Sequence, residues 1–240
     1  MSNYNPKLSV IVPVFNEQER LFHLDEICKY FLPATEIIVV NDGSTDSTVE
    51  LLKKYLKKYR NIKIISYVPN RGKGYAVRQG MLAAKGVYHL FLDIDLSTSP
   101  KHWPEFSRHL READVIIGSR RSANAVIAGR QSVLRENMGR VFTWLSRVFL
   151  ATPVNDFTCG FKVFSASAAE SIFSRSRIDR WGFDAEILFI AHSLRLKIMS
   201  LPVTWTNDPA TRVFLFRDTL TSLGDLFFIR WNSILGKYNH

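Results

Sequence analysis

The chain has 240 residues, of which 46% are hydrophobic. This length and apolar content are enough for one or two domains with a buried core, and they exclude a disordered chain or a small disulfide scaffold. With 32 Lys and Arg against 22 Asp and Glu, the net charge is +10 and the sequence pI is about 9.7. This charge favours a negatively charged partner, namely a nucleic acid, an anionic lipid or a phosphorylated substrate, and composition does not choose among the three.

Two cysteines are present, Cys28 and Cys159, with apolar neighbours and no CxxC or Cys/His spacing. This pattern predicts neither a disulfide framework nor a zinc site and indicates a reduced, cytosolic setting. The N-terminus, MSNYNPK, lacks the apolar run of a secretory signal, and no uncharged apolar stretch reaches the roughly 18 residues that a membrane span needs. We therefore expect a cytoplasmic protein that meets any membrane at its cytosolic face.

The first half alternates apolar strand patterns with helix-length segments. Leu8–Val14 is a short apolar run of β-branched residues, typical of a strand buried on both faces of a sheet. Similar short runs lie at Glu36–Val40, Ile62–Ser66, Tyr88–Leu92 and Asp114–Gly118. The intervening segments predict helices at Glu19–Phe31, Asp46–Tyr59, Lys73–Ala84 and Lys101–Arg111. This alternation predicts right-handed βαβ units and a doubly wound, mostly parallel sheet of the nucleotide-binding type.

The second half is less regular, and it contains no repeat, low-complexity tract or obvious linker. Helices are predicted at Ser132–Leu150, Ala166–Ser174, Asp184–Leu194 and Arg217–Leu235, strands at Phe161–Phe164 and Lys197–Trp205, and turns or loops at Pro153–Gly160 and Thr206–Arg212. We therefore expect one compact unit in place of two independent domains.

Acidic residues collect where the predicted strands end, which is where open α/β sheets bind ligands. Asp93 and Asp95 flank one residue in LFLDIDLSTSP, so an extended chain points both carboxylates to the same side. Two anions this close repel unless a cation or a proton intervenes, and carboxylate oxygens suit Mg²⁺ or Mn²⁺ shared with substrate phosphates. The alternative is a solvated pair that opens a turn before Pro100.

Asp42 follows the second predicted strand, in VVNDGSTDST. Here Gly43 permits a tight turn, and Asp46 or its neighbours would cap the next helix. One interpretation is a plain strand-to-helix turn. In the other, Asp42 accepts a hydrogen bond from a nucleobase or a ribose, as acidic residues do at such strand ends.

Ordered motifs across the chain resemble a known enzyme family. The first half carries VIVPVFNE, VVNDGSTD, NRGKGYAVRQGMLAAKG, FLDIDLSTSP and GSR, and the second half carries NDFTCGFKVF, RWGFDAEILFIA and VTWTND. The first set is similar to family 2 of the GT-A-fold glycosyltransferases. The second set resembles the dolichyl-phosphate and polyprenyl-phosphate glycosyltransferases, especially the glucosyl type. The resemblance implies a GT-A α/β fold with a mostly parallel central sheet and a C-terminal helical extension.

The resemblance also implies roles for particular residues. The nucleoside pocket of an activated sugar would be lined by Pro13, Phe15, Asn16, Glu17 and Asp42, closed nearby by Arg71 to Gly74, which include Lys73. Asp93 and Asp95, with Ile94 between them, would contact the nucleotide and hold Mg²⁺ or Mn²⁺ on its diphosphate. Ser97 stands where many relatives have a Gln that helps to ligate the metal, so it is the candidate third ligand.

Phosphate contacts in this family come from arginines, whose forked guanidinium matches phosphate oxygens. The candidates are Arg120 and Arg135, with Arg130 and Arg140 as alternatives, and Arg212 stands where relatives often have a lysine that closes over the diphosphate. Glu186, together with Asp184, lies in the region where relatives that accept a hydroxyl keep their base. The alternative there is an Arg180–carboxylate pair that holds the helix.

The implied reaction is inverting transfer of a hexose from a nucleotide sugar, UDP-glucose or else GDP-mannose, to a polyprenyl phosphate. A phosphate monoester is mostly dianionic at pH 7, so it needs no base to accept its proton. The first alternative is a family 2 enzyme that acts on a hydroxyl of a glycan or glycolipid. The distant alternative is a basic nucleic-acid-binding protein, which lacks a recognition motif here and leaves the carboxylates unexplained.

The C-terminal segment mixes aromatic and basic residues. We expect a catalytic domain at 1–212 and an amphipathic helical segment at 213–240, either lying on a membrane surface or packed on the core or in a dimer. Many relatives append membrane spans, which this sequence does not show, so a separate membrane subunit or a homodimer are candidate partners; nucleic acid is not expected.

Overall fold

The computed structural model describes residues 7–31, 35–129, 133–207 and 215–239. Within them, a seven-stranded sheet has the order β3-β2-β1-β4-β7-β5-β8. The strands are β1 (Leu8–Val14), β2 (Thr35–Asp42), β3 (Ile62–Tyr67), β4 (Tyr88–Leu92), β5 (Val115–Ser119), β7 (Phe161–Ser165) and β8 (Ile198–Pro202). The five apolar runs of the first half therefore form strands, as their pattern predicts.

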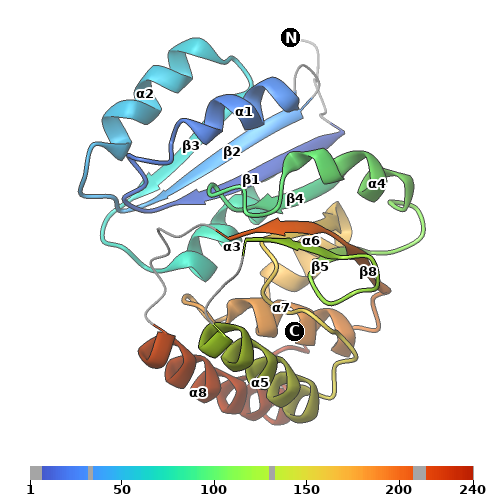
Figure 1. Ribbon diagram of the computed structural model, residues 1–240. Coiled ribbons are helices and arrows are strands. Elements are labelled where there is room, and N and C mark those ends of the chain that lie inside the picture. The colour runs from blue at the N-terminus through green and yellow to red at the C-terminus, as the bar shows by residue number, and fades with distance from the viewer. Residues whose placement is uncertain (1–6, 32–34, 130–132, 208–214, 240) are drawn as a thin grey trace.

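Helices cover both faces of this sheet (Figure 1). They are α1 (His23–Tyr30), α2 (Thr48–Lys58), α3 (Lys73–Ala83), the 3₁₀ helix η1 (Pro100–His102), α4 (Trp103–Arg108), α5 (Val133–Leu150), α6 (Ala166–Phe173), α7 (Phe183–Ser193) and α8 (Leu215–Ile234). Figure 1 shows α1, α2 and α4 on one side of the sheet and α3, α6 and α7 on the other, with α5 and α8 forming an outer layer beyond α7. The result is the α/β layering that the sequence predicts.

The sheet is mostly parallel, with one exception. β1 pairs in parallel with β2 and β4, β2 with β3, and β5 with β8, whereas β7 runs antiparallel between β4 and β5. The strand order reverses between β1 and β4, because the chain builds outward from β1 to β3 and then returns to β4. Residues that follow β1 and β4 thus lie at a topological switch point, where sheets of this class bind ligands.

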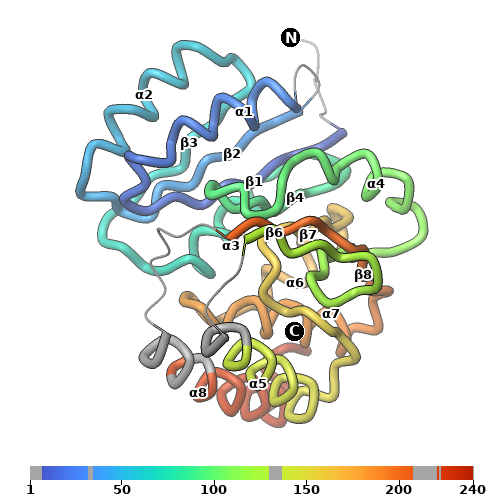
Figure 2. Tube along the Cα trace, viewed as in Figure 1, coloured from blue at the N-terminus to red at the C-terminus, as the bar shows by residue number. Residues whose placement is uncertain are grey.

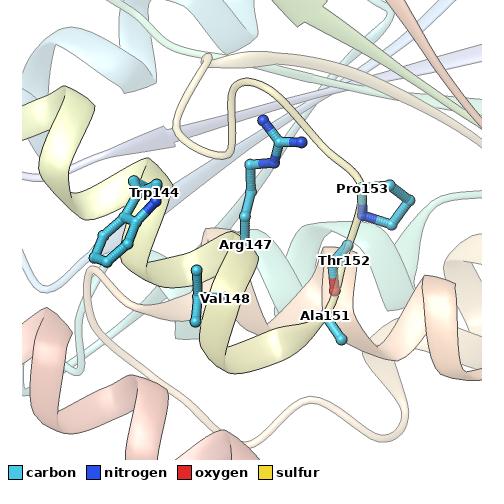
Figure 3. Close-up of a pocket in the computed structure, with 6 residues that line it drawn as sticks. All are labelled: Trp144, Arg147, Val148, Ala151, Thr152 and Pro153. Carbon is cyan, nitrogen blue, oxygen red and sulfur yellow. The ribbon is translucent and has the colours of Figure 1, made fainter.

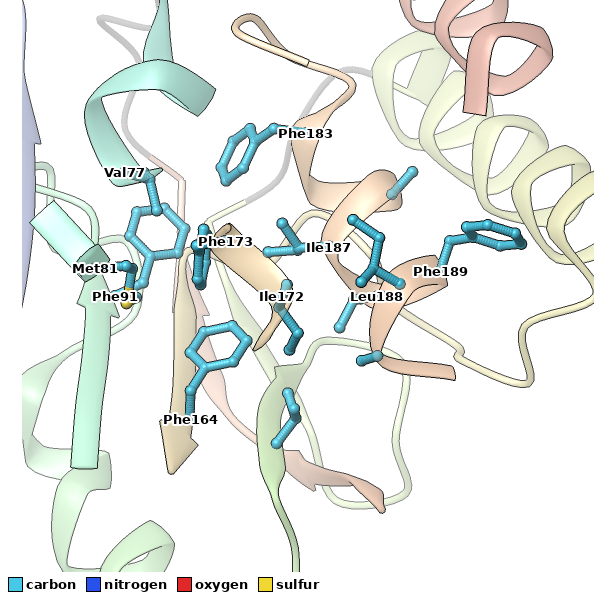
Figure 4. Packing of buried hydrophobic residues seen from close by; sticks show 14 of the residues in the cluster. Val77, Met81, Phe91, Phe164, Ile172, Phe173, Phe183, Ile187, Leu188 and Phe189 are labelled. Atoms are coloured by element: carbon cyan, nitrogen blue, oxygen red, sulfur yellow. The ribbon is translucent and has the colours of Figure 1, made fainter. Parts of the chain in front are cut away.

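Two apolar clusters hold the layers together, one on each face. Alternate residues of a strand point to opposite faces, so Ile11 and Phe91 join one cluster, while Val10, Val12 and Leu90 join the other. Figure 4 shows the first cluster, in which Phe91 of β4 and Phe164 of β7 meet side chains from α3, α6 and α7. The rings of Phe91 and Phe183 lie 5.9 Å apart, edge to face.

A small second sheet lies beside the first. β6 (Val126–Ala128) pairs in parallel with β9 (Thr204–Thr206), and Figure 2 shows β6 next to the strand layer. The Thr206 amide donates to the Ser97 carbonyl (2.8 Å), and Thr98 forms a bridge with Trp205. This sheet therefore connects the turn after β4 to the C-terminal part of the chain.

Several element boundaries shift by one or two residues from the sequence-based expectation, and at three places the difference is larger. Residues 19–22 form turns, so α1 begins at His23, and the segment expected as one helix over 101–111 divides into η1 and α4. The strand expected at 197–205 breaks at Val203, whose amide donates to the Ser119 carbonyl (3.3 Å). The chain leaves the main sheet there and continues as β9, which pairs with β6, while Val203 itself is buried at 1% exposure.

The C-terminal helix packs on the rest of the molecule. α8 contacts α5 and α7, and the rings of Phe149 and Phe227 lie 4.9 Å apart between α5 and α8. The expected boundary at 212/213 falls outside the described residues, so the division into two parts stays a prediction. Among the residues that the structure describes, no helix is long and apolar enough to cross a membrane.

Candidate active site

The site is built around the turn that follows β4. The Asp93 amide donates to the Gly160 carbonyl (3.2 Å), and the Leu96 amide donates back to the Asp93 carbonyl (3.2 Å). Leu96 takes a positive φ of 50°, and Asp95 Oδ1 accepts from the Ser97 amide (2.8 Å). The turn is therefore tight and hydrogen-bonded, and it brings Asp93, Asp95 and Ser97 together at the switch point, as expected.

A lysine from the next helix faces this turn. Lys73, the first residue of α3, places its Nζ 2.8 Å from Asp93 Oδ1 and 3.0 Å from Asp93 Oδ2. The same ammonium lies 5.3 Å from the ring centres of Phe91 and Trp181. Burial by itself would lower the pKa of Lys73, but the negative charges of Asp93 and Asp184 outweigh burial and raise that pKa, so the lysine is charged.

The two aspartates fit a divalent cation. Burial, with the charge of Asp93 added, raises the pKa of Asp95 above its ordinary value, which means that this carboxylate lacks a sufficient positive neighbour. The described residues hold no cluster of three or more His, Cys, Asp or Glu side chains that would form a closed metal site. An ion on Asp93 and Asp95 would complete its shell with substrate oxygens and water, which is how Mg²⁺ commonly binds.

Asp42 organises the loop that leads to Lys73. Its carboxylate, 3% exposed, accepts from Asn70 Nδ2 (2.7 Å) and from the backbone amides of Arg71 (2.8 Å) and Gly72 (2.8 Å). Gly72 adopts φ 115°, a conformation that favours glycine. Asp42 therefore shapes residues 70–72, and this contact is one that the sequence did not predict.

The loop after β1 is fastened to the loop after β2. Asn16 takes φ 53°, and its Oδ1 accepts from the amides of Thr45 (2.7 Å) and Asp46 (3.3 Å). The Glu17 amide donates to Thr48 Oγ1 (2.9 Å). Pro13 is buried within β1, while Phe15 is 37% exposed. Pro13, Phe15, Asn16, Glu17 and Asp42 thus lie at or beyond the carboxyl ends of two adjacent strands, and their contact with a nucleoside stays a prediction.

Arg120 has a protein partner that the sequence did not indicate. Its Nε and Nη2 bind Asp156 Oδ2 (2.8 Å) and Oδ1 (2.7 Å) in a fork, and Nη2 also donates to Thr158 Oγ1 (2.7 Å). Burial by itself would raise the pKa of the fully buried Asp156, but the Arg120 charge outweighs burial and lowers it. The guanidinium, 5.6 Å from the Trp205 ring, is held rigidly through two of its three nitrogens.

Of the two acidic residues on α7, Asp184 acts electrostatically on cations of the predicted site. It pairs with Lys162, a fully buried side chain on β7 whose Nζ also donates to the Cys159 carbonyl (2.7 Å). The negative charge of Asp184 stabilises both the Lys73 ammonium and the Arg120 guanidinium. Lys162 lies directly opposite Phe91 in the β4–β7 pairing, so a strand register that sequence does not reveal brings it here.

Glu186, in the region where hydroxyl-accepting relatives have their base, has a different environment. It is 0% exposed, with Oε2 accepting from the amides of Arg177 (2.9 Å) and Ile178 (2.8 Å) and Oε1 accepting from the Tyr238 hydroxyl (2.8 Å). Burial raises the pKa of this carboxyl. Its contacts join α7 to residues 177–178 and to the C-terminal end of the chain, and none of them involves Asp93 or Asp95.

The remaining predicted residues either lie outside the described part of the chain or contact other protein groups. The Arg135 backbone belongs to α5, but its side chain lies outside the described residues, as do Arg130 and Arg212 entirely. Arg71 contacts Asp179 (3.6 Å) and stacks on Tyr75, 3.6 Å from the ring centre. A surface hollow at the end of α5, lined by Trp144, Arg147, Val148, Ala151, Thr152 and Pro153, contains none of the predicted site residues (Figure 3).

Known proteins agree with this architecture. The model of glycosyl transferase family 2 matches residues 9–173. A dolichyl-phosphate beta-glucosyltransferase of Drosophila melanogaster is 32% identical over 253 residues, which cover 97% of this chain and 77% of that protein. The protein of the same name from Homo sapiens is 32% identical over 250 residues, with the same coverage of 97% and 77%.

A solved structure shares the fold. Glucosyl-3-phosphoglycerate synthase from Mycobacterium tuberculosis, crystallised with Mn²⁺, UDP and glucosyl-3-phosphoglycerate, superposes with a TM-score of 0.63 at 21% identity, covering 98% of this chain and 80% of that one. The mostly parallel sheet, with paired aspartates after the strand at its switch point, defines a glycosyltransferase of the GT-A fold. The chain belongs to glycosyl transferase family 2, and its activity is that of a hexosyltransferase.

Proposed function

We propose that this enzyme transfers glucose from UDP-glucose to the phosphate of a polyprenyl lipid of the dolichyl type, with inversion at the anomeric carbon. The observation that carries the proposal is the 32% identity, over 97% of the chain, to proteins named dolichyl-phosphate beta-glucosyltransferase. UDP-glucose is the favoured donor, and GDP-mannose is the alternative that the assay below compares.

The donor would lie across the ends of β1, β2 and β4. The loops after β1 and β2 are joined by hydrogen bonds, and Asp42 fixes residues 70–72 at the edge of the same region. Asp93 and Asp95 would hold Mg²⁺ or Mn²⁺, and such an ion, when bound, offsets the charge of the leaving diphosphate. Lys73 and Arg120 add positive charge, which would stabilise the negative charge that develops on the leaving diphosphate.

The acceptor chemistry needs alignment more than proton removal. A lipid phosphate with a second pKa near 6 is mostly dianionic at pH 7, so no side chain has to remove a proton from it. The contacts of Glu186 support this view, because both of its oxygens already accept hydrogen bonds within the protein. In-line attack by the phosphate oxygen then forms the new glycosidic bond as the bond to the nucleoside diphosphate breaks.

The outer helical layer supports a position at a membrane surface. Exposed apolar side chains recur at helical spacing on α5, at Val141 (56%), Trp144 (62%) and Val148 (59%). On α8 they are Phe227 (63%), Trp231 (61%) and Ile234 (71%). The exposed cations Arg147, Arg230 and Lys237 lie on the same two helices or just after them. Aromatic side chains with cations are the composition of segments that lie on anionic lipid surfaces, so we assign this layer to the cytosolic face of a membrane.

The test is a comparison of acceptors with the purified chain. Radiolabelled UDP-glucose or GDP-mannose is incubated with Mn²⁺ and one of three acceptors: a short polyprenyl phosphate, the corresponding polyprenol or a soluble glycan. We expect label in the lipid phase only when UDP-glucose is combined with polyprenyl phosphate. Transfer to the polyprenol or to the glycan, with none to the phosphate, would show a hydroxyl acceptor and refute the proposal.

A further inference from the structure

Lys73 occupies the position of a counter-cation to Asp93. Its Nζ lies 2.8 and 3.0 Å from the two carboxylate oxygens, so the ammonium faces the edge of the carboxylate that a metal ion would use. Like Asp93, Lys73 is mostly enclosed, with 22% of its side chain exposed against 24% for the aspartate. Water therefore screens this pair less than it screens a surface ion pair.

The ammonium is held in this place by backbone geometry. Asp42 binds the Gly72 amide immediately before Lys73 (2.8 Å). A Cβ on Gly72 would lie 2.5 Å from the Asp179 carbonyl, and a Cβ on Gly74 would lie 2.5 Å from the Ile178 carbonyl, so the start of α3 is pressed against residues 178–179. Lys73 can change its rotamer, but its Cα has little freedom to move away from Asp93.

A divalent ion and this ammonium would share one carboxylate. Two cations a few ångströms apart in a partly buried site repel by several kcal/mol at an effective dielectric of about 20, which weakens metal binding to the free protein. A nucleoside diphosphate reduces this repulsion between the metal ion and the ammonium, because its oxygens supply negative charge for both cations. Asp184, whose negative charge also acts on Lys73, favours the charged ammonium in this region.

We propose that Lys73 makes metal binding at Asp93 and Asp95 dependent on the nucleoside diphosphate: the ammonium competes with the metal in the free enzyme and turns to the diphosphate when the donor binds. The proposal rests on the proposed function for its nucleotide donor. Lys73 thereby ensures that the metal ion binds tightly only together with the nucleoside diphosphate.

The experiment measures Mn²⁺ binding, by the electron paramagnetic resonance signal of free Mn²⁺, with and without UDP. We expect UDP to strengthen Mn²⁺ binding to the wild type about tenfold or more, within the usual range of coupling between two sites. In Lys73→Met, Mn²⁺ alone should bind about tenfold more tightly than to the wild type, and UDP should add little. Lys73→Arg, which keeps the charge, should bind Mn²⁺ alone as weakly as the wild type.

Arg71→Met is the matched control, because Arg71 is a cation of the same loop whose contacts are Asp179 and Tyr75. It should leave Mn²⁺ binding without UDP unchanged. If Lys73→Met is unfolded by circular dichroism, Lys73→Gln replaces it. Unchanged or weaker Mn²⁺ binding in these variants without UDP, or no Mn²⁺ binding in any protein, overturns the proposal. The titration contains no acceptor, so failure of sugar transfer to lipid would contradict the proposed function and not this inference.

Discussion

At the scale of single residues, Asp93 is confined from two sides. Lys73 contacts its carboxylate, and Gly160, directly before β7, lies so close that a Cβ there would be 2.0 Å from Asp93 Oδ2. Glycine is thus required at 160 by a close approach, although its backbone needs no special conformation. The Asp93 carboxylate, a proposed metal ligand, can take its position because residue 160 has no side chain.

We expect Gly160→Ala to reduce transferase activity about 100-fold, because the new methyl group forces the Asp93 carboxylate out of place and a displacement near 1 Å has costs of that order. Mn²⁺ binding in the presence of UDP should weaken as well. Gly224→Ala is the control, since no atom lies within 4 Å of a Cβ there. It should keep activity and, as a glycine replaced in a helix, gain up to about 1 kcal/mol of stability. Equal activity of both variants would contradict the proposed role of Gly160.

The buried pair of Lys162 and Asp184 gives a second expectation at this scale. Lys162→Met leaves Asp184 buried without its cation, so the free energy of unfolding should fall by about 3–5 kcal/mol in urea denaturation. Adding Asp184→Leu should recover most of this loss, because an apolar pair needs no compensating charge. A loss below about 1 kcal/mol in the single variant would show that the pair is not as isolated from water as its 0% and 7% side-chain exposures indicate.

Sequence alone identified some of these residues and not others. Asp93 and Asp95 are separated by one residue after an apolar strand, and that local pattern is sufficient to predict a shared site. Lys162 and Asp156 acquire their roles from partners 22 and 36 positions away, through a strand pairing and a loop contact that leave no local signal. The environment of Glu186, a candidate catalytic residue, was not predictable either, because helical spacing does not indicate that its carboxylate binds the amides of residues 177 and 178.

At the scale of elements, the central strands are joined by a buried carboxylate. Glu36 of β2 accepts from Ser9 Oγ of β1 (2.5 Å), from Lys63 Nζ of β3 and from the Lys85 amide (3.0 Å). Burial by itself would raise the pKa of Glu36, but these hydrogen bonds outweigh burial and leave it below its ordinary value of 4.5. The ionised form is therefore bound more tightly in the folded protein than in the unfolded chain.

The sign of the pH effect follows from this direction. The stability contributed by ionised Glu36 is present above the unfolded pKa, near 4.5, and is lost as the pH falls through the lower folded pKa. We expect Glu36→Gln to cost about 1–3 kcal/mol at pH 7, measured by urea unfolding, with the difference from wild type shrinking below pH 4.5. A difference that grows as the pH falls in that range would contradict the assigned direction.

Element types were more predictable than their directions. The runs at 8–14 and 88–92 have the bounds that their apolar pattern predicts, since strands buried on both faces are continuously apolar. Nothing in Phe161–Ser165 indicates that it inserts antiparallel between β4 and β5, because the same alternation of side chains suits either direction. That insertion brings residues 156–162 to the site.

At the scale of the whole molecule, the cations behind the net charge of +10 can be assigned to particular regions. Some of the cations lie at the site, and others accompany the exposed aromatic residues of α5 and α8. We expect the protein to sediment with vesicles that contain anionic lipid, and the double variant Trp144→Ser/Trp231→Ser to lose at least about tenfold in partitioning, since burying one such ring contributes more than 1.4 kcal/mol. Leu56→Ser is the control, because Leu56 is 45% exposed on α2, across the sheet. Equal partitioning of the two variants would place the membrane contact elsewhere.

We propose that the two aspartates after β4 serve the transfer of a sugar to a lipid phosphate. The most direct measurement is the initial rate of label transfer from UDP-glucose to a short polyprenyl phosphate with Mn²⁺, for the wild type and for Asp95→Ala. We expect an acid-labile glucosyl lipid from the wild type and a rate at least about 100-fold lower from the variant, in line with the several kcal/mol that metal stabilisation supplies. A wild type that forms no lipid-linked sugar from any common donor would contradict the proposed reaction, and an Asp95→Ala variant with full activity would contradict the role of the aspartates.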